Sequence, residues 1–292
     1  ILLAVILSVL MPFLHFLSMG KMPMAGISGA MVLGSFVLVS LKPGLPEAVD
    51  FKTLHFSEGI TGQLIVADFK EDGQMFRTLL INRIGQTRFN MDENYSAWPY
   101  VNYLTSAASI YPPGSRTLVL GLGGGVVPRQ IAYSLGHSVD AVELDQRIVD
   151  LSEKYFDFWR ARITTYSDDA RRYVKKCESR YDFIVLDIFN GEIMPSHGLS
   201  VEAFSDINRI LKPGGLVAVN FNGFLSGREG VAGRSLIRTI KASGFNVSIL
   251  DCGAGAVPEK DRNLIYFAYK EPPKWQNARV YMSVADKVCR ID

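Results

Sequence analysis

Cysteine and histidine are scarce in this sequence of 292 residues, which contains three cysteines and four histidines. Cys177, Cys252 and Cys289 are far apart and form neither a metal-binding spacing nor a disulfide framework, which favours a reducing compartment. The histidines are equally dispersed, so we predict no metal site. The formal net charge is only +2 and no basic run carries interleaved aromatic residues, so we predict no nucleic-acid-binding surface.

Charge is almost absent from the start of the sequence, where Lys21 is the one charged residue before Lys42. Residues 1–19 and 24–41 form two uncharged apolar runs, each close to the roughly 20 residues that a helix needs to cross a bilayer. We therefore expect a transmembrane hairpin with its exit linker over residues 1–45, in an inner or cytoplasmic membrane. A cleaved signal peptide, a single span and a buried helical hairpin are competing interpretations. The sequence starts without an initiator methionine, as the later part of a longer protein would.

Glycine is concentrated directly after a short run of β-forming residues at 116–120. An amphipathic segment from 128 to 135 follows a cluster of four glycines, Gly121, Gly123, Gly124 and Gly125. This pattern predicts a strand, a tight turn and a helix, and glycine there lets the backbone turn sharply and approach a ligand. An ordinary strand–helix turn that merely requires glycine is the alternative.

Strands and helices are predicted to alternate from this loop to about residue 269, which indicates a Rossmann-like, doubly wound parallel sheet. Acidic residues lie at or just after the ends of three successive predicted strands: Glu143, Asp168 with Asp169, and Asp187. Because the carboxyl ends of parallel strands share one edge, we expect these acids to converge on the crevice opened by the glycine loop.

Glu143 stands roughly 20 positions beyond Gly121, where a carboxylate is placed to accept hydrogen bonds from ribose hydroxyls. A nucleoside site is therefore predicted at the glycine loop. Asp169 is placed both to line this site and to cap the helix that follows it.

The segment before the glycine loop has a different pattern, with alternating β-branched stretches at residues 62–68 and 75–82 around a turn at 71–73. These stretches predict a small antiparallel β domain. We therefore divide the chain after the transmembrane part into a β-rich domain at 46–110, a Rossmann-like domain at 111–271, and a tail at 272–292.

From about residue 51 to residue 269, three quarters of the chain, the sequence resembles the polyamine aminopropyltransferases, or spermidine synthase family. It most resembles the branch in which this domain is fused behind transmembrane helices. The matching segments are residues 80–82, 92–93 and 95, 121–125, 142–145, 169–171 and 181–187. Residues 212–215 also match, but many class I methyltransferases share that Lys-Pro-Gly-Gly turn. The resemblance thus implies that the Rossmann-like domain is of the class I methyltransferase type.

The resemblance implies decarboxylated S-adenosylmethionine as a co-substrate, with no permanently bound cofactor. It implies that Glu143 binds the ribose hydroxyls and that Asp169 lies near the adenine amine. The residues implied to bind this donor are Gly121, Gly123, Gly125, Glu143, Asp168 and Asp169. Because adenosyl donors are made in the cytoplasm, the globular part is expected to face it.

The resemblance also implies an acceptor, a small-molecule amine that attacks the carbon next to the sulfonium and releases methylthioadenosine. Asp187 matches the acid that helps to deprotonate or orient this amine, and Tyr95 matches a tyrosine beside it. An alkylammonium needs a carboxylate to bind it and a proton acceptor to free its lone pair. Trp98, Tyr100 and Tyr103 follow at a spacing more typical of helix core than of a substrate pocket.

The sequence departs from the family pattern at acids that would bind a diamine or the ammonium group of the donor. Val126 stands where an acid normally follows the glycines, Asn190 replaces a second acid after Asp187, and Ser96-Ala97 replaces a Gln-Glu pair. Two alternatives therefore stay open: an enzyme that uses intact S-adenosylmethionine, such as a methyltransferase, and a non-catalytic membrane-complex subunit. The expected partner is a second copy of the chain or another membrane protein.

Overall fold

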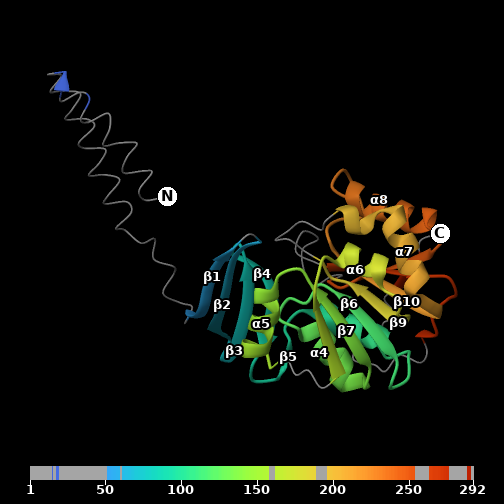
Figure 1. The fold of residues 1–292 in the computed structure, drawn as a ribbon, viewed down its shortest axis with the longest axis horizontal. Helices are drawn as coiled ribbons and strands as arrows, with labels where there is room; N and C mark the ends of the chain where they lie inside the picture. The colour runs from blue at the N-terminus through green and yellow to red at the C-terminus, as the bar shows by residue number, and fades with distance from the viewer. Residues whose placement is uncertain are drawn as a thin grey trace. The chain divides into compact units, whose positions relative to one another are not determined.

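The computed structural model describes residues 15, 18–19, 51–59, 61–157, 162–188, 196–253, 263–275 and 288–290 (Figure 1). The chain divides into two compact units, Ile1–Asp50 and Phe51–Asp292, and the predicted domain borders inside the second unit stay predictions. The two apolar runs predicted to cross a bilayer lie outside the described residues, apart from residues 15 and 18–19. Among the residues that are described, no helix combines the length and the apolar character needed for a membrane span.

The second unit begins with a five-stranded sheet in which neighbouring strands pair in sequence order and run antiparallel. The strands are β1 (Phe51–Gly59), β2 (Gly62–Glu71), β3 (Gln74–Ile81), β4 (Ile84–Asn90) and β5 (Tyr95–Ser96). Asp72 and Gly73 connect β2 to β3 with φ values of 49° and 82°, the left-handed conformation that tight hairpins require. The predicted antiparallel β domain is confirmed.

A second sheet has eight strands in the order β13-β11-β12-β10-β9-β6-β7-β8. Their bounds are β6 (Arg116–Leu120), β7 (Ser138–Glu143), β8 (Ile163–Ser167), β9 (Tyr181–Leu186), β10 (Leu211–Asn222), β11 (Asn246–Asp251), β12 (Asn263–Tyr269) and β13 (Val288–Arg290). Strands β6 to β10 pair in parallel, as predicted.

The prediction of an all-parallel sheet is wrong at one side, because β12 pairs antiparallel with both β10 and β11, and β13 pairs antiparallel with β11. The link between β11 and β12, residues 252–262, is shorter than the dozen or more residues that a parallel crossover needs. Strand β13 also shows that part of the predicted tail belongs to this sheet.

Helices cover both faces of the larger sheet (Figure 1). Along β9, Phe183 and Val185 pack into one apolar cluster while Ile184 and Leu186 pack into the other, so the strand is buried on both faces. The first cluster includes side chains of α3 (Pro99–Ala108), α4 (Val126–Leu135) and α5 (Gln146–Tyr155). The second includes side chains of α6 (Ala170–Lys176), α7 (Val201–Ile210) and α8 (Val231–Ala242). The doubly wound arrangement is therefore present.

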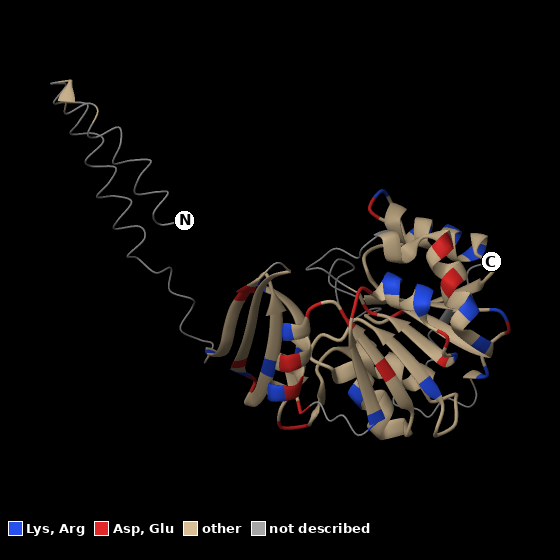
Figure 2. Ribbon diagram, in the orientation of Figure 1, with Lys and Arg blue, Asp and Glu red and all other residues tan. Residues whose placement is uncertain are grey.

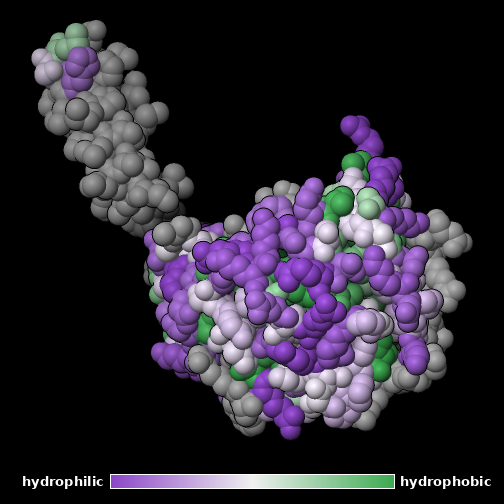
Figure 3. Space-filling model, turned by 45° about the vertical axis from the view of Figure 1, so that its right-hand side comes forward, coloured by the Kyte–Doolittle hydropathy of each residue, from purple (hydrophilic) through white to green (hydrophobic). Residues whose placement is uncertain are grey.

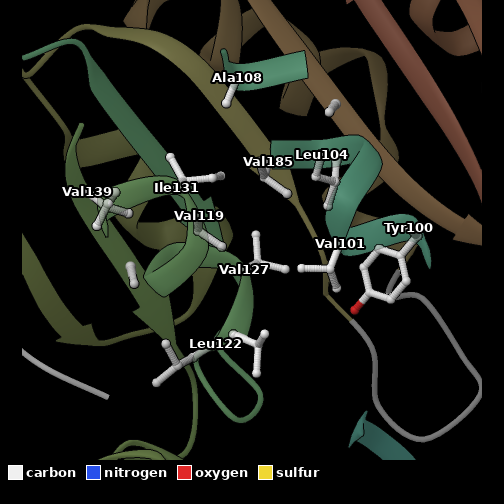
Figure 4. Close-up of a cluster of buried hydrophobic side chains, with 14 of the residues drawn as sticks. Tyr100, Val101, Leu104, Ala108, Val119, Leu122, Val127, Ile131, Val139 and Val185 are labelled. Atoms are coloured by element: carbon white, nitrogen blue, oxygen red, sulfur yellow. The ribbon is translucent and has the colours of Figure 1, made fainter. Parts of the chain in front are cut away.

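The first cluster also joins the two sheets into one core. Figure 4 shows Val127 and Ile131 of α4 near Val119 of β6, with Leu104 of α3 beside Val185 of β9 in the same cluster. The same cluster contains buried side chains of the smaller sheet, among them Leu64, Val66, Leu79 and Phe89. This packing fixes the smaller sheet beside the carboxyl ends of the parallel strands, where the predicted site lies.

Candidate active site

The carboxyl ends of β6, β7, β8 and β9 open into a cavity of ≈ 730 Å³. Figure 2 shows acidic residues in the loops at this edge of the sheet, and Figure 3 shows apolar residues between hydrophilic ones on the face of the molecule that it presents. The smaller sheet and its connection to α3 close the other side with Ile84, Gly85, Gln86, Thr87, Ser96 and Trp98. The smaller sheet and the larger sheet thus both contribute residues to one cavity.

The glycine loop adopts a backbone that other residues would strain. Gly121 has φ = 95°, and a Cβ atom built there would lie 2.1 Å from the backbone oxygen of Asp187. Gly123 also has a positive φ, 53°, and both residues line the cavity. Gly125, predicted to bind the donor, is not among the lining residues; with φ = 76° it caps the N-terminus of α4.

The backbone N–H groups of the loop are engaged by neighbouring parts of the protein. Gly121 donates to the carbonyl of Val142 (2.8 Å), and Gly125 donates to that of Leu122 (2.9 Å). Gly124 donates to the Thr87 hydroxyl of β4 (2.7 Å), a contact that sequence reasoning missed. Thr87 therefore holds the glycine loop against the smaller sheet.

Glu143 ends β7 and lines the cavity at the glycine loop. Its Oε2 accepts from the N–H of Leu122 (3.0 Å), and its Oε1 accepts from the N–H of Asp145 (3.1 Å). Burial raises the pKa of Glu143, and the backbone hydrogen bonds oppose that rise. Each carboxylate oxygen can accept more than one hydrogen bond, so the fixed carboxylate can also bind ligand hydroxyl groups.

Asp168 and Asp169 follow β8 and line the same cavity. Asp168 forms an ion pair with Arg172 one turn along α6. Asp169 caps α6 by accepting from the N–H of Arg172 (2.9 Å), and its Oδ2 lies 3.6 Å from Nε2 of His197. Asp169 is thus both a helix cap and a lining residue, the two roles that its position allowed.

Asp187 follows β9 and is fixed by two neutral side chains. Its Oδ2 accepts from the Tyr100 hydroxyl (3.1 Å), and its Oδ1 accepts from Nδ2 of Asn220 (2.7 Å). Burial raises the pKa of Asp187, while these two hydrogen bonds lower it. Burial beside the Asp187 carboxylate also raises the pKa of Tyr100 well above its ordinary value, so Tyr100 remains a donor. The site therefore contains a partly buried carboxylate whose pKa is raised.

The structure places Tyr100, rather than Tyr95, at this carboxylate. Tyr95 is 37% exposed, is not among the lining residues, and its hydroxyl interacts with Glu93. Pro99 begins α3 directly after Trp98, and the first turn of this helix directs Tyr100 to the strand ends. The interpretation of the three aromatic residues as helix core fits Tyr103, which is 2% exposed, but it misses the polar contact of Tyr100.

The structure describes some of the positions that depart from the family pattern. Val126 and Ser96 line the cavity, so an apolar side chain and a hydroxyl occupy two places where acidic or amide groups were expected. Asn190 lies outside the described residues. Within the described ranges, no group of His, Cys, Asp or Glu side chains is arranged to hold a metal ion.

Comparison with known proteins agrees with this arrangement. The family model of the spermine/spermidine synthase domain matches residues 101–270, more than half of the chain. The chain belongs to the spermine/spermidine synthase family. The match covers the strands that carry Glu143, Asp168, Asp169 and Asp187.

Two curated bacterial proteins illustrate the similarity. A polyamine aminopropyltransferase of Vibrio vulnificus is 36% identical over 129 residues, which cover 42% of this chain and 43% of that protein. A probable polyamine aminopropyl transferase of Bifidobacterium longum is 27% identical over 235 residues, which cover 78% of this chain and 50% of that protein. The chain thus spans about half the length of these relatives.

Solved structures show the same fold. A probable spermidine synthase from Corynebacterium glutamicum superposes with a TM-score of 0.61 at 23% identity, over 74% of this chain and 80% of that one. The spermidine synthase from Thermotoga maritima gives a TM-score of 0.60 at 14% identity, over 78% and 76% of the two chains. These likenesses show the fold, over about three quarters of this chain.

Proposed function

We propose that this chain transfers an aminopropyl group from decarboxylated S-adenosylmethionine to an amine and releases methylthioadenosine. The observation that carries the proposal is the Asp187 carboxylate, which lies at a strand end in the same cavity as Glu143 and accepts hydrogen bonds from the neutral side chains Tyr100 and Asn220. A carboxylate whose pKa is raised by burial is suited to accept a proton from an ammonium group at neutral pH. The names of the curated relatives support the same reaction class.

The reaction exchanges one bond for another. The amine nitrogen forms a bond to the carbon next to the sulfonium, the carbon–sulfur bond breaks, and its electron pair neutralises the sulfur. The nitrogen must lose one proton, which Asp187 accepts before or during the attack. Tyr100 and Asn220 hold the carboxylate so that its free lone pairs face the cavity.

The other acids of the cavity are proposed to bind the donor. Glu143, fixed by two backbone N–H groups, would accept the ribose hydroxyls, and Asp168 and Asp169 would lie beside the adenine. The sulfonium charge is favoured by the nearby carboxylates and by the aromatic faces of Trp98 and Tyr100.

The glycine loop supports a donor without a carboxylate. A carboxylate of intact S-adenosylmethionine would be stabilised by free backbone N–H groups, but Gly121, Leu122, Gly124 and Gly125 already donate to groups of the protein. Val126 adds an apolar side chain at the same place. This part of the cavity therefore favours the decarboxylated donor.

A turnover assay tests the proposal. Purified protein is mixed with decarboxylated or intact S-adenosylmethionine and with monoamines and diamines of graded length, and released methylthioadenosine is quantified. We expect release with the decarboxylated donor and a loss of about 100-fold or more in Asp187→Asn, the range of general-base contributions. Binding of methylthioadenosine to Asp187→Asn should be retained.

The matched control is Asp150→Asn, which changes an exposed carboxylate on α5 that accepts from Gln146 and does not line the cavity. This variant should keep the full rate. Absence of methylthioadenosine with every amine, together with S-adenosylhomocysteine formed from the intact donor, would instead establish a methyltransferase. Binding of none of the adenosyl ligands would support a non-catalytic subunit.

We further propose that the chain belongs to the membrane-fused branch of the family, with its catalytic part in the cytoplasm. The uncharged apolar runs at residues 1–19 and 24–41 support this proposal. After expression in a bacterial host, the chain should remain in the membrane pellet after alkaline carbonate washing, whereas a variant starting at residue 51 should be released. Light scattering of the detergent-extracted chain would show whether it pairs with a second copy.

A further inference from the structure

We propose that Asn263 is a positioning residue. It fixes the orientation of the Asn220 carboxamide and thereby keeps a hydrogen-bond donor on the Asp187 carboxylate. The inference rests on the proposed function for its link to turnover. Asn263 is the first residue of β12, and Asn220 lies in the neighbouring strand β10. Neither residue was singled out by the sequence pattern.

Three side chains form a directed series of hydrogen bonds. Asn263 donates through Nδ2 to Oδ1 of Asn220 (2.9 Å), and Asn220 donates through its own Nδ2 to Oδ1 of Asp187 (2.7 Å). Asn220 is only 1% exposed, so water does not readily replace these partners. Each bond places a donor against an acceptor only in this one orientation of the Asn220 carboxamide.

The orientation matters because the two ends of a carboxamide have nearly the same shape and opposite hydrogen-bonding character. If the Asn220 group turned over, its oxygen would face the Asp187 oxygen and its NH₂ group would face the Asn263 NH₂ group. Asn263 therefore prevents the reversal by donating to the oxygen end. If the Asn263 donor is lost, the Asn220 carboxamide has less preference for the orientation in which its N–H donates to Asp187.

The surroundings of Asp187 contain few groups that could replace this donor. Tyr100 of α3 and Cys252 after β11 line the cavity together with Asp187, and the pKa of Tyr100 is raised by both Asp187 and Cys252. Glu143, Asp168 and Asp169 line the cavity from β7 and β8. Arg171 and His197 also line it, but Arg171 pairs with Asp206 and His197 lies beside Asp169. Neither Tyr100 nor these acids can donate to Oδ1 in place of Asn220, because Tyr100 already donates to Oδ2 and carboxylates only accept.

Two variants of Asn263 separate the orientation effect from other effects. Asn263→Leu keeps the approximate volume and removes the donor without adding charge. Asn263→Asp keeps the shape and replaces the donor with an acceptor, which favours the reversed orientation of Asn220. We expect the Asp187 carboxyl to titrate at higher pH in both variants, by roughly one pH unit in Asn263→Leu and by more in Asn263→Asp.

The primary measurement is carbon-13 NMR of protein labelled at aspartate side chains, with the Asp187 resonance assigned by its loss in Asp187→Asn. This titration requires no turnover. The control is Asn246→Asp, the same change at a residue of β11 whose side chain donates to the carbonyl of Lys270 and does not line the cavity. It should leave the Asp187 titration unmoved.

Turnover supplies a second readout. The acidic limb of the pH profile of kcat/KM should move upward with the NMR titration, a tenfold loss at fixed pH below the limb for a shift of one unit. Binding of methylthioadenosine should stay within twofold of the unmodified protein in every variant. If the unmodified protein shows no turnover, the proposed function fails, and the NMR titration still decides the positioning role.

An Asp187 titration that is the same in Asn263→Leu, Asn263→Asp and the unmodified protein would overturn the inference. A lower rate with an unmoved acidic limb would equally overturn it, because that result describes a structural defect without an effect on Asp187.

Discussion

Replacement of Glu143 by glutamine tests the donor site most directly. The substitution keeps the shape of the side chain and removes its charge. Both oxygens of Glu143 accept from backbone N–H groups, Oε2 from Leu122 and Oε1 from Asp145. A glutamine has only one acceptor oxygen, so its NH₂ group must face one of these two N–H groups. One hydrogen bond therefore becomes a contact between two donors.

The size of the effect follows from the hydrogen bonds that are lost. A hydrogen bond to a charged group contributes about 1.5–3 kcal/mol. If Glu143 binds the ribose hydroxyls as a carboxylate, loss of one such bond weakens methylthioadenosine binding about 10- to 100-fold, since about 1.4 kcal/mol is a factor of ten. The buried N–H left without an acceptor should also lower the free energy of unfolding by about 1–3 kcal/mol.

Isothermal titration calorimetry with two ligands isolates the ribose contact. The ligands are methylthioadenosine and its analogue without the two ribose hydroxyls. The unmodified protein should prefer the diol, and Glu143→Gln should lose most of this preference, as in a double-mutant cycle. Glu229→Gln, at an exposed position before α8, controls for loss of one negative charge. An unchanged preference for the diol in Glu143→Gln would refute Glu143 as the ribose acceptor.

Two further predictions concern stability. Gly121→Ala should lower the thermal midpoint far more than Gly73→Ala. Both positions have positive φ, but an added Cβ meets the Asp187 backbone oxygen at Gly121 and nothing within 4 Å at Gly73; equal losses of about 1–2 kcal/mol would contradict the clash. Burial lowers the pKa of His137, so the stability it contributes is present above its unfolded pKa of about 6.5 and falls as pH drops toward the folded value. Chemical denaturation should show that the free energy of unfolding of the unmodified protein is lower at pH 5.5 than at pH 7.5. This difference should be smaller in His137→Gln, and an equal difference in both proteins would contradict the role of His137.

The sequence was sufficient to predict the parts of the site that depend on local order. Gly121 and Glu143 belong to consecutive elements of one strand–helix–strand unit, whose geometry is set by right-handed crossovers. Asp187 follows an apolar strand that had to be buried on both faces, so its position at the carboxyl edge could be inferred without knowing its contacts. The same reasoning placed Asp168 and Asp169 beside them.

The groups that act on these acids could not be predicted because they come from distant parts of the chain. Thr87 reaches Gly124 from the smaller sheet, and Tyr100 reaches Asp187 from α3. Their positions depend on how the two sheets pack, for which the sequence has no local signal. Asn220 and Asn263 meet because β12 runs antiparallel to β10, the part of the sheet that was predicted to be parallel.

The different environments of the two buried carboxylates match two different tasks under the proposed function. Backbone N–H groups of Leu122 and Asp145 hold Glu143, and these fixed dipoles oppose the rise in its pKa that burial causes. Asp187 is held by a hydroxyl and a carboxamide, and burial opposes its charge. An arriving ammonium group would favour the charged form of Asp187, and departure of that positive charge by proton transfer would return the carboxyl to the neutral form that burial favours. Burial raises the pKa of both acids, so the contrast lies in their partners: backbone donors hold the acid proposed to bind hydroxyl groups, whereas side chains hold the acid proposed to exchange a proton with the amine.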